Sequence, residues 1–92
     1  GLVGVGQIGQ GVLRRAQGFG MRVLAYDPLL EAQGGLSGVT FTDLDTLLAE
    51  SDFVSVHAPA LPETRNMFNA ARFAQMKPTA YFINTARGEL IA

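Results

Sequence analysis

The 92-residue sequence has no cysteine and no tryptophan, a single histidine and only 16% charged residues. Without cysteine the chain cannot form disulfide bonds, use a thiol nucleophile or bind a metal through thiolates, and this fits a reducing compartment. Seven basic and eight acidic residues are scattered along the chain, so no basic patch favours nucleic acid or an anionic membrane. No signal peptide or membrane-spanning apolar run is visible. We therefore expect a cytoplasmic protein with neither nucleic acid nor a membrane as partner, and no metal site.

The sequence also lacks an initiator methionine, because Gly1 already stands at the start of an apolar segment. Its hydrophobic content of 48% is high for a small domain. The last residues, from Glu89 onward, read as the beginning of another helix. These observations predict that residues 1–92 are part of a larger protein, that the end of the domain lies elsewhere, and that the piece alone is poorly folded and catalytically inactive.

Glycine is plentiful, and three of the 11 glycines form the run G-x-G-x-x-G at Gly4, Gly6 and Gly9. In such a run the first glycine permits a tight turn after a strand and the second lets the backbone approach a pyrophosphate. The third lets the following helix pack against the sheet, with its free N–H groups aimed at the phosphates. The run predicts a phosphate-bearing ligand, although glycine-rich turns also occur where nothing binds.

The residues that follow support a dinucleotide site. Apolar residues recur at helical spacing after the turn, at Ile8, Val12, Ala16 and Phe19. A buried strand is expected at 21–26, and Asp27 closes it 18 residues after Gly9, where a carboxylate would accept hydrogen bonds from ribose hydroxyls. A 2′-phosphate would meet like charge there, at a cost of up to about 4 kcal/mol per charge pair. Residues 28–33 supply no Arg or Lys, so NAD is favoured over NADP.

The rest of the chain continues the alternation of strands and helices. Thr42 and Asp45 have the spacing of a capping box, and Asn69 is a candidate N-cap. The expected elements are a helical turn at 29–33, strands at 39–41, 53–57 and 80–83, a helix ending near Ser51, and a helix that carries Phe73 and Met76 inward. This order predicts an α/β fold, a doubly wound parallel sheet of the Rossmann type, incomplete at about five strands with crossover helices. Its polar and glycine-rich segments all follow strand ends, which meet at one crevice.

Several motifs in this order resemble a known family. They are Gly4-Val5-Gly6-Gln7-Ile8-Gly9, Tyr26-Asp27-Pro28, His57-Ala58-Pro59 with Pro62-Glu63-Thr64, Met76-Lys77-Pro78 and Ile83-Asn84-Thr85-Ala86-Arg87-Gly88. Together they resemble the NAD-binding domain of the D-isomer-specific 2-hydroxyacid dehydrogenases over nearly the whole chain. Ala60 stands where the family usually has Leu, and Thr79 where it often has Gly, and neither position touches the chemistry.

The resemblance implies a role for each matching residue. Those expected to bind the cofactor are Gly4, Gly6, Gln7, Ile8, Gly9, Asp27, His57, Ala58, Pro59, Thr64, Thr85 and Ala86. The resemblance implies that Arg87 is catalytic, binding the substrate carboxylate through two parallel hydrogen bonds. It also implies a Glu and a His acid/base pair outside this chain, a separate substrate domain, and a homodimer in the full-length protein. The substrate would be a small 2-hydroxy or 2-oxo acid.

Other interpretations remain open at this point. Asp27 could simply cap a helix, Thr64 and Thr85 could be turn residues, and Arg87 could be an ordinary surface arginine. His57 invites assignment as a proton-transfer group, but the family pattern places it beside the cofactor and the catalytic histidine elsewhere. Some relatives sense nucleotides as corepressors without turnover. A methyltransferase also uses a glycine turn followed by an acid, but it leaves the motifs at 57–59 and 84–88 unexplained.

Overall fold

The computed structural model describes all 92 residues as one five-stranded parallel sheet with helices on its faces. The strands are β1 (Leu2–Val3), β2 (Leu24–Tyr26), β3 (Thr40–Phe41), β4 (Phe53–Val56) and β5 (Tyr81–Asn84), in the spatial order β3-β2-β1-β4-β5. The helices are α1 (Gln7–Gly18), α2 (Pro28–Ala32), α3 (Leu44–Glu50), α4 (Ala70–Ala74) and the 3-10 turn η1 (Gly88–Leu90). The predicted doubly wound fold is confirmed.

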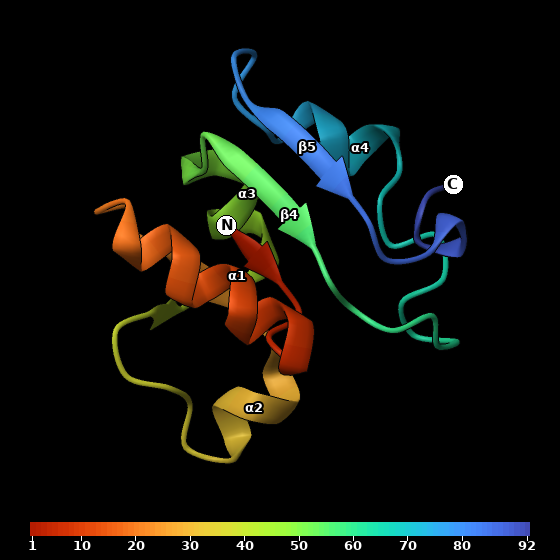
Figure 1. Cartoon of the computed structure of the whole chain (residues 1–92). Coiled ribbons are helices and arrows are strands. Elements are labelled where there is room, and N and C mark those ends of the chain that lie inside the picture. The colour runs from red at the N-terminus through yellow and green to blue at the C-terminus, as the bar shows by residue number, and fades with distance from the viewer.

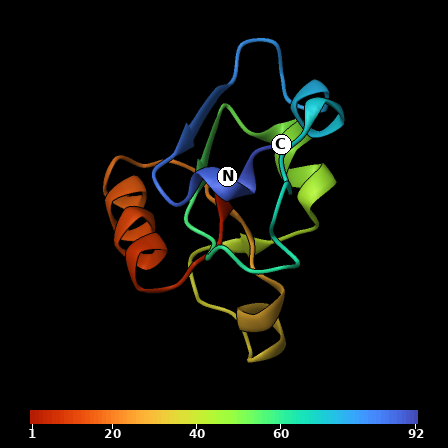
Figure 2. The same ribbon diagram turned by 90° about the vertical axis from the view of Figure 1, so that its right-hand side faces the viewer.

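The helices divide between the two faces of the sheet. Figure 2 shows α1 on one side of the strands and α3 and α4 on the other. In Figure 1, α1 crosses in front of β1, while β4 and β5 run side by side with no helix in front of them. Because β1 lies at the centre of the strand order, the chain reverses its direction of winding there, so the crevice for a ligand opens at the end of β1.

The central strand is buried on both faces, which explains its uninterrupted apolar sequence. Leu2 pairs with Ala25 of β2 on one side and with Ser55 of β4 on the other. Leu2 and Val3 are buried, and Val3 is almost inaccessible to solvent. A strand covered on both faces cannot alternate apolar with polar residues, so its short length and continuous hydrophobicity are what a parallel sheet requires.

Two hydrophobic clusters lie on opposite sides of the sheet. The larger, on the side of α3 and α4, contains Val3, Leu24, Leu44, Leu47, Leu48, Val54, Val56, Ala58, Phe68 and Leu90. Phe68 is fully buried, and its ring centroid lies 4.9 Å from that of Phe82. The smaller cluster, on the side of α1, contains Leu2, Val5, Leu13, Val23 and Ala25. Each fully buried Val, Leu or Phe side chain contributes roughly 1.5–3 kcal/mol to the free energy of folding. The two clusters therefore fix the ends of the strands that form the site.

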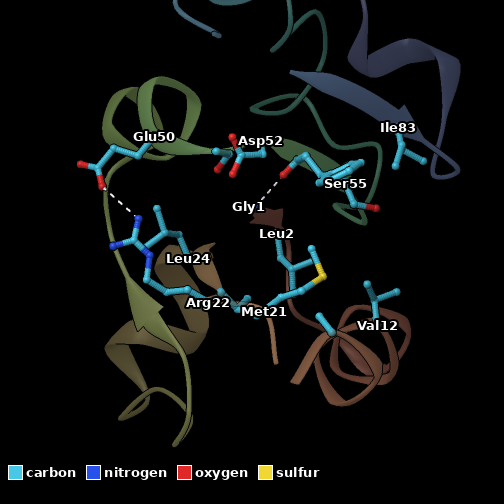
Figure 3. Close-up of a pocket in the computed structure, with 14 residues that line it drawn as sticks. Gly1, Leu2, Val12, Met21, Arg22, Leu24, Glu50, Asp52, Ser55 and Ile83 are labelled. Atoms are coloured by element: carbon cyan, nitrogen blue, oxygen red, sulfur yellow. Dashed lines mark hydrogen bonds and ion pairs between the residues drawn. The ribbon is translucent and has the colours of Figure 1, made fainter. Parts of the chain in front are cut away.

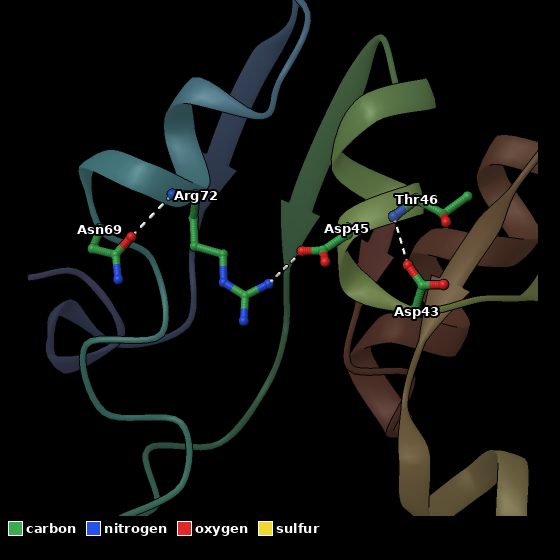
Figure 4. Close-up of polar contacts among 5 residues, drawn as sticks. All are labelled: Asp43, Asp45, Thr46, Asn69 and Arg72. Atoms are coloured by element: carbon green, nitrogen blue, oxygen red, sulfur yellow. Dashed lines mark hydrogen bonds and ion pairs between the residues drawn. The ribbon is translucent and has the colours of Figure 1, made fainter.

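Side-chain caps fix where two of the helices begin. Asp43 accepts a hydrogen bond from the Thr46 N–H at 2.7 Å, and Asn69 accepts one from the Arg72 N–H at 2.9 Å (Figure 4). The cap bond holds the pKa of Asp43 below its usual range. The N-cap predicted at Asn69 is confirmed, but the capping box predicted from Thr42 is wrong: Asp43, one residue later, caps α3 instead.

Some of the expected packing also differs. Ile8 and Phe19 share helical spacing with Val12 and Ala16, but 74% of the surface of Ile8 and 87% of that of Phe19 are exposed. Ile8 lies in the first turn of α1 and Phe19 follows the last helical residue, and neither belongs to a hydrophobic cluster. Gly9 and Leu13 are the buried residues of α1, and Val12 and Ala16 are partly buried against the smaller cluster, as their spacing predicts. Helix α4 ends at Ala74, so Met76 packs against the core from the segment that follows it.

Candidate functional site: a crevice at the carboxyl ends of the strands

The glycine turn is so tightly packed that two of its three positions exclude any side chain. Gly4 has φ of +88°, and a Cβ built there would lie 2.7 Å from the Ala58 nitrogen. A Cβ on Gly9 would lie 2.5 Å from the Gly4 carbonyl oxygen. The first turn of α1 therefore presses directly against the end of β1 and the segment after β4. Both glycines are required by the fold itself.

Gly6 differs, because a Cβ built on it would meet no atom within 4 Å. Gly6 is also the N-cap of α1, and no side chain caps the helix there. The first N–H groups of a helix have no partner within it, and the first turn of α1 carries no acidic residue. An open space in front of an uncapped 12-residue helix fits a pyrophosphate, which would accept hydrogen bonds from these amides. Gln7 and Ile8 are exposed beside this space.

Asp27 connects the end of β2 to the glycine turn. Its Oδ2 accepts a hydrogen bond from the Val5 N–H at 2.8 Å, and its Oδ1 accepts one from the Leu30 N–H at 3.0 Å. The carboxylate thus caps α2 and is held beside the turn at the same time. A carboxylate oxygen accepts more than one hydrogen bond, so both oxygens keep capacity for a ligand hydroxyl. The role of Asp27 in ribose binding stays a prediction, and the structure adds a second role as a cap.

A groove of about 250 Å³ opens beside the turn, lined by Ile8, His57, Ala58, Thr85, Ala86 and Arg87. These residues come from three segments far apart in the sequence: the start of α1, the end of β4 and the loop after β5. The sequence predicted that these segments would meet, and in the structure they do. Arg87 is exposed and makes no ion pair, so its guanidinium is available to a ligand carboxylate.

His57 lies between the sheet and the first turn of α1. Its Nε2 is 2.8 Å from the Ser55 hydroxyl, and its Cβ would be 3.7 Å from a Cβ on Gly9. Burial lowers the pKa of the imidazole below its ordinary value of 6.5, because burial penalises the charged form. The ring is therefore mainly neutral at pH 7.

Thr64 and Pro59, predicted to contact the cofactor from the loop after β4, do not line the groove. Thr64 is buried, and its hydroxyl donates to the Pro59 carbonyl at 2.6 Å and accepts from the Leu61 N–H at 2.8 Å. It therefore shapes the loop after β4 from within. Pro59 is exposed next to Ala58. Their contact with a cofactor stays a prediction.

A larger hollow of about 550 Å³ lies at the opposite ends of the strands (Figure 3). Its lining includes Met21 and Arg22 before β2 and Asp52 before β4, with an ion pair between Arg22 and Glu50 at 3.8 Å. Ligands of such sheets bind at the carboxyl ends of the strands, so the smaller groove beside the glycine turn is the better candidate despite its size.

The structure also bears on a metal site and on a membrane-spanning helix. No group of three or more His, Cys, Asp and Glu residues is placed to hold a metal ion. No helix is long and apolar enough to cross a membrane.

The glycine turn entering α1, the acid that closes β2 and the groove at the carboxyl ends of β4 and β5 define a dinucleotide-binding domain of the Rossmann type. The family model for the D-isomer-specific 2-hydroxyacid dehydrogenase NAD-binding domain matches residues 1–92. The chain belongs to this family, and its cofactor is NAD.

The similarity to individual relatives is high over a limited part of their length. D-lactate dehydrogenase of Escherichia coli K12 is 47% identical over 99% of this chain and 28% of the relative. D-3-phosphoglycerate dehydrogenase of Synechocystis sp. is also 47% identical, over 99% of this chain and 17% of the relative. The NAD-complexed 2-hydroxyacid dehydrogenase of Lactobacillus delbrueckii ssp. bulgaricus superposes with a TM-score of 0.86 at 43% identity, over 99% of this chain and 27% of that structure. The chain thus spans between about a sixth and about three tenths of these relatives.

Proposed function

We propose that the protein carrying this domain is an NAD-dependent oxidoreductase that transfers hydride between the nicotinamide and C2 of a small D-2-hydroxy or 2-oxo acid. The observation that carries the proposal is the groove that brings Arg87 beside the glycine turn, together with Ala58, Thr85 and Ala86. A permanently charged, planar guanidinium next to the cofactor site suits a substrate whose invariant group is a carboxylate.

Different residues of this chain are proposed to bind the adenosine ribose, the pyrophosphate and the substrate. Asp27 is proposed to accept hydrogen bonds from the adenosine ribose, while the amides at the start of α1 bind the pyrophosphate through the space in front of Gly6. When bound, NAD supplies the hydride chemistry. Arg87, which lines the groove, is proposed to bind the substrate carboxylate and orient C2.

The remaining parts of the enzyme are proposed to lie outside these 92 residues. They are the Glu and His acid/base pair that the family resemblance implies, the end of the NAD-binding domain and a substrate-closing domain. His57 is assigned to cofactor binding instead of proton transfer, because the family resemblance places it beside the cofactor and the catalytic histidine elsewhere. We further propose that the full-length protein is a cytoplasmic homodimer.

The proposed function is tested by assaying the full-length protein with NADH and a panel of 2-oxo acids: pyruvate, hydroxypyruvate, glyoxylate and longer branched acids. We expect oxidation of NADH with at least one of them and a product of D configuration wherever C2 becomes chiral. Tight binding of NADH without turnover on any acid would instead identify a nucleotide-sensing module. If the protein does not bind NADH, both the dehydrogenase and the nucleotide-sensing hypotheses are contradicted.

A further inference from the structure

We infer that Asn84 is a positioning residue: its side-chain amide fixes the loop that carries Arg87 and so directs the guanidinium into the groove. The inference rests on the proposed function, since it matters for turnover only if Arg87 binds the substrate. Asn84 is the last residue of β5, three positions before Arg87, and it was not singled out as a site residue from the sequence.

Both polar atoms of the Asn84 side chain are used within the loop. Its Oδ1 accepts a hydrogen bond from the Ala86 N–H at 3.0 Å, and its Nδ2 donates to the Arg87 carbonyl oxygen at 3.0 Å. The side chain therefore bridges the backbone on either side of the Ala86–Arg87 peptide bond. With both ends of that peptide held, the direction in which the Arg87 side chain leaves the loop is restricted.

The chain is anchored again immediately after Arg87. Leu90, at the end of η1, is fully buried in the larger hydrophobic cluster, and its carbonyl oxygen accepts a hydrogen bond from the Phe68 N–H at 2.9 Å. The Glu89 carbonyl oxygen accepts one from the Asn66 N–H at 2.8 Å. Arg87 thus lies between the Asn84 amide and the buried Leu90. Its side chain makes no ion pair.

Few residue types meet the requirement at position 84. The side chain must be short and must present one acceptor and one donor at the same time, which an amide does. Aspartate would keep the acceptor for Ala86 but turn an oxygen toward the Arg87 carbonyl, and alanine would lose both bonds. The Arg87 carbonyl oxygen also accepts a hydrogen bond from the Leu90 N–H at 3.3 Å, but Asn84 is the one side chain bonded to the backbone of Ala86 and Arg87.

The test is a double-mutant cycle with Asn84→Ala and Arg87→Ala in the full-length enzyme. Asn84→Ala should lower kcat/KM for the 2-oxo acid about 10- to 100-fold, because a displacement of about 1 Å at a positioning group has an effect of this size. The change should appear mainly in the KM for the acid and exceed the change in NADH affinity. In the Arg87→Ala background the same substitution should alter kcat/KM by less than about twofold.

Asn69→Ala is the matched control, since Asn69 also accepts a backbone hydrogen bond, from Arg72, but neither lines the groove nor bonds to the loop that carries Arg87. It should leave the KM unchanged. A wild-type KM in Asn84→Ala, or an equal loss of kcat/KM with and without Arg87, would overturn the inference.

Hydrogen exchange of the Ala86 amide gives a second readout that does not depend on turnover. The amide should be protected in the wild type and in Asn69→Ala and exchange quickly in Asn84→Ala. If the wild-type enzyme reduces no 2-oxo acid, the proposed function fails, yet this exchange still tests whether Asn84 fixes the loop. Equal protection in Asn84→Ala and the wild type would overturn the inference whatever the activity.

Discussion

Gly9→Ala should destabilise the NAD-binding domain by about 2–3 kcal/mol or more, whereas Gly6→Ala should leave its stability within about 0.5 kcal/mol of the wild type. The contrast follows from the space at each position. A Cβ on Gly9 would lie 2.5 Å from the Gly4 carbonyl oxygen, an atom fixed by the end of β1, and relief requires α1 to move off the sheet. A Cβ on Gly6 meets nothing, and its φ of −78° suits an L-amino acid.

Gly6→Ala should nevertheless weaken NADH binding at least tenfold, or about 1.4 kcal/mol, because its methyl group would occupy the space proposed for the pyrophosphate. Urea unfolding and fluorescence titration with NADH, both on the full-length protein, measure the two quantities separately. Gly18→Ala is the matched control: it also lies in α1 with open space around it, but at the far end. Normal NADH affinity in Gly6→Ala would show that no phosphate approaches the turn.

Arg87→Ala should lower kcat/KM for the 2-oxo acid by about 10²–10³-fold while leaving NADH affinity nearly unchanged, a loss comparable to removing one preorganised donor from an active site. The guanidinium has no ion-pair partner in the structure, so its removal leaves no unpaired protein charge. Steady-state kinetics and NADH titration of the full-length enzyme provide the two measurements.

Two further variants make this result specific. Arg87→Lys keeps the charge but loses the paired donors, and we expect it to restore only part of the activity. Arg72→Ala removes an arginine that pairs with Asp45 at 3.1 Å on the surface, away from the groove, and activity should be unchanged. Wild-type kcat/KM in Arg87→Ala would refute the role assigned to Arg87.

The fold was predictable because short stretches of the sequence determine its turns and strands. Close backbone contacts require glycine at Gly4 and Gly9, and Asp27 follows a buried strand and bonds to the turn between them. Continuous apolar sequence is typical of parallel strands covered on both faces, as β1 is, although Tyr81 and Ile83 of the equally apolar β5 are exposed. These requirements leave few alternatives, and the structure has the predicted topology.

The finer features depend on contacts that no local pattern contains. Asp43 and Thr42 are both acceptable cap residues in the sequence, and only the entry path of the chain into α3 decides that Asp43 is used. Ile8 has helical spacing with Val12, but its side chain is exposed and lines the groove instead of the core. Asn84 resembles any polar residue after a strand until its two hydrogen bonds are visible.

The most direct test of the account is a crystal structure of the full-length protein with NAD bound. We predict that a carboxylate oxygen of Asp27 lies within hydrogen-bonding distance of an adenosine ribose hydroxyl while Asp27 keeps its bond to the Val5 N–H. The pyrophosphate should lie against Gly6 and the first amides of α1. An adenosine ribose that does not contact Asp27, or a pyrophosphate bound away from the glycine turn, would contradict the account.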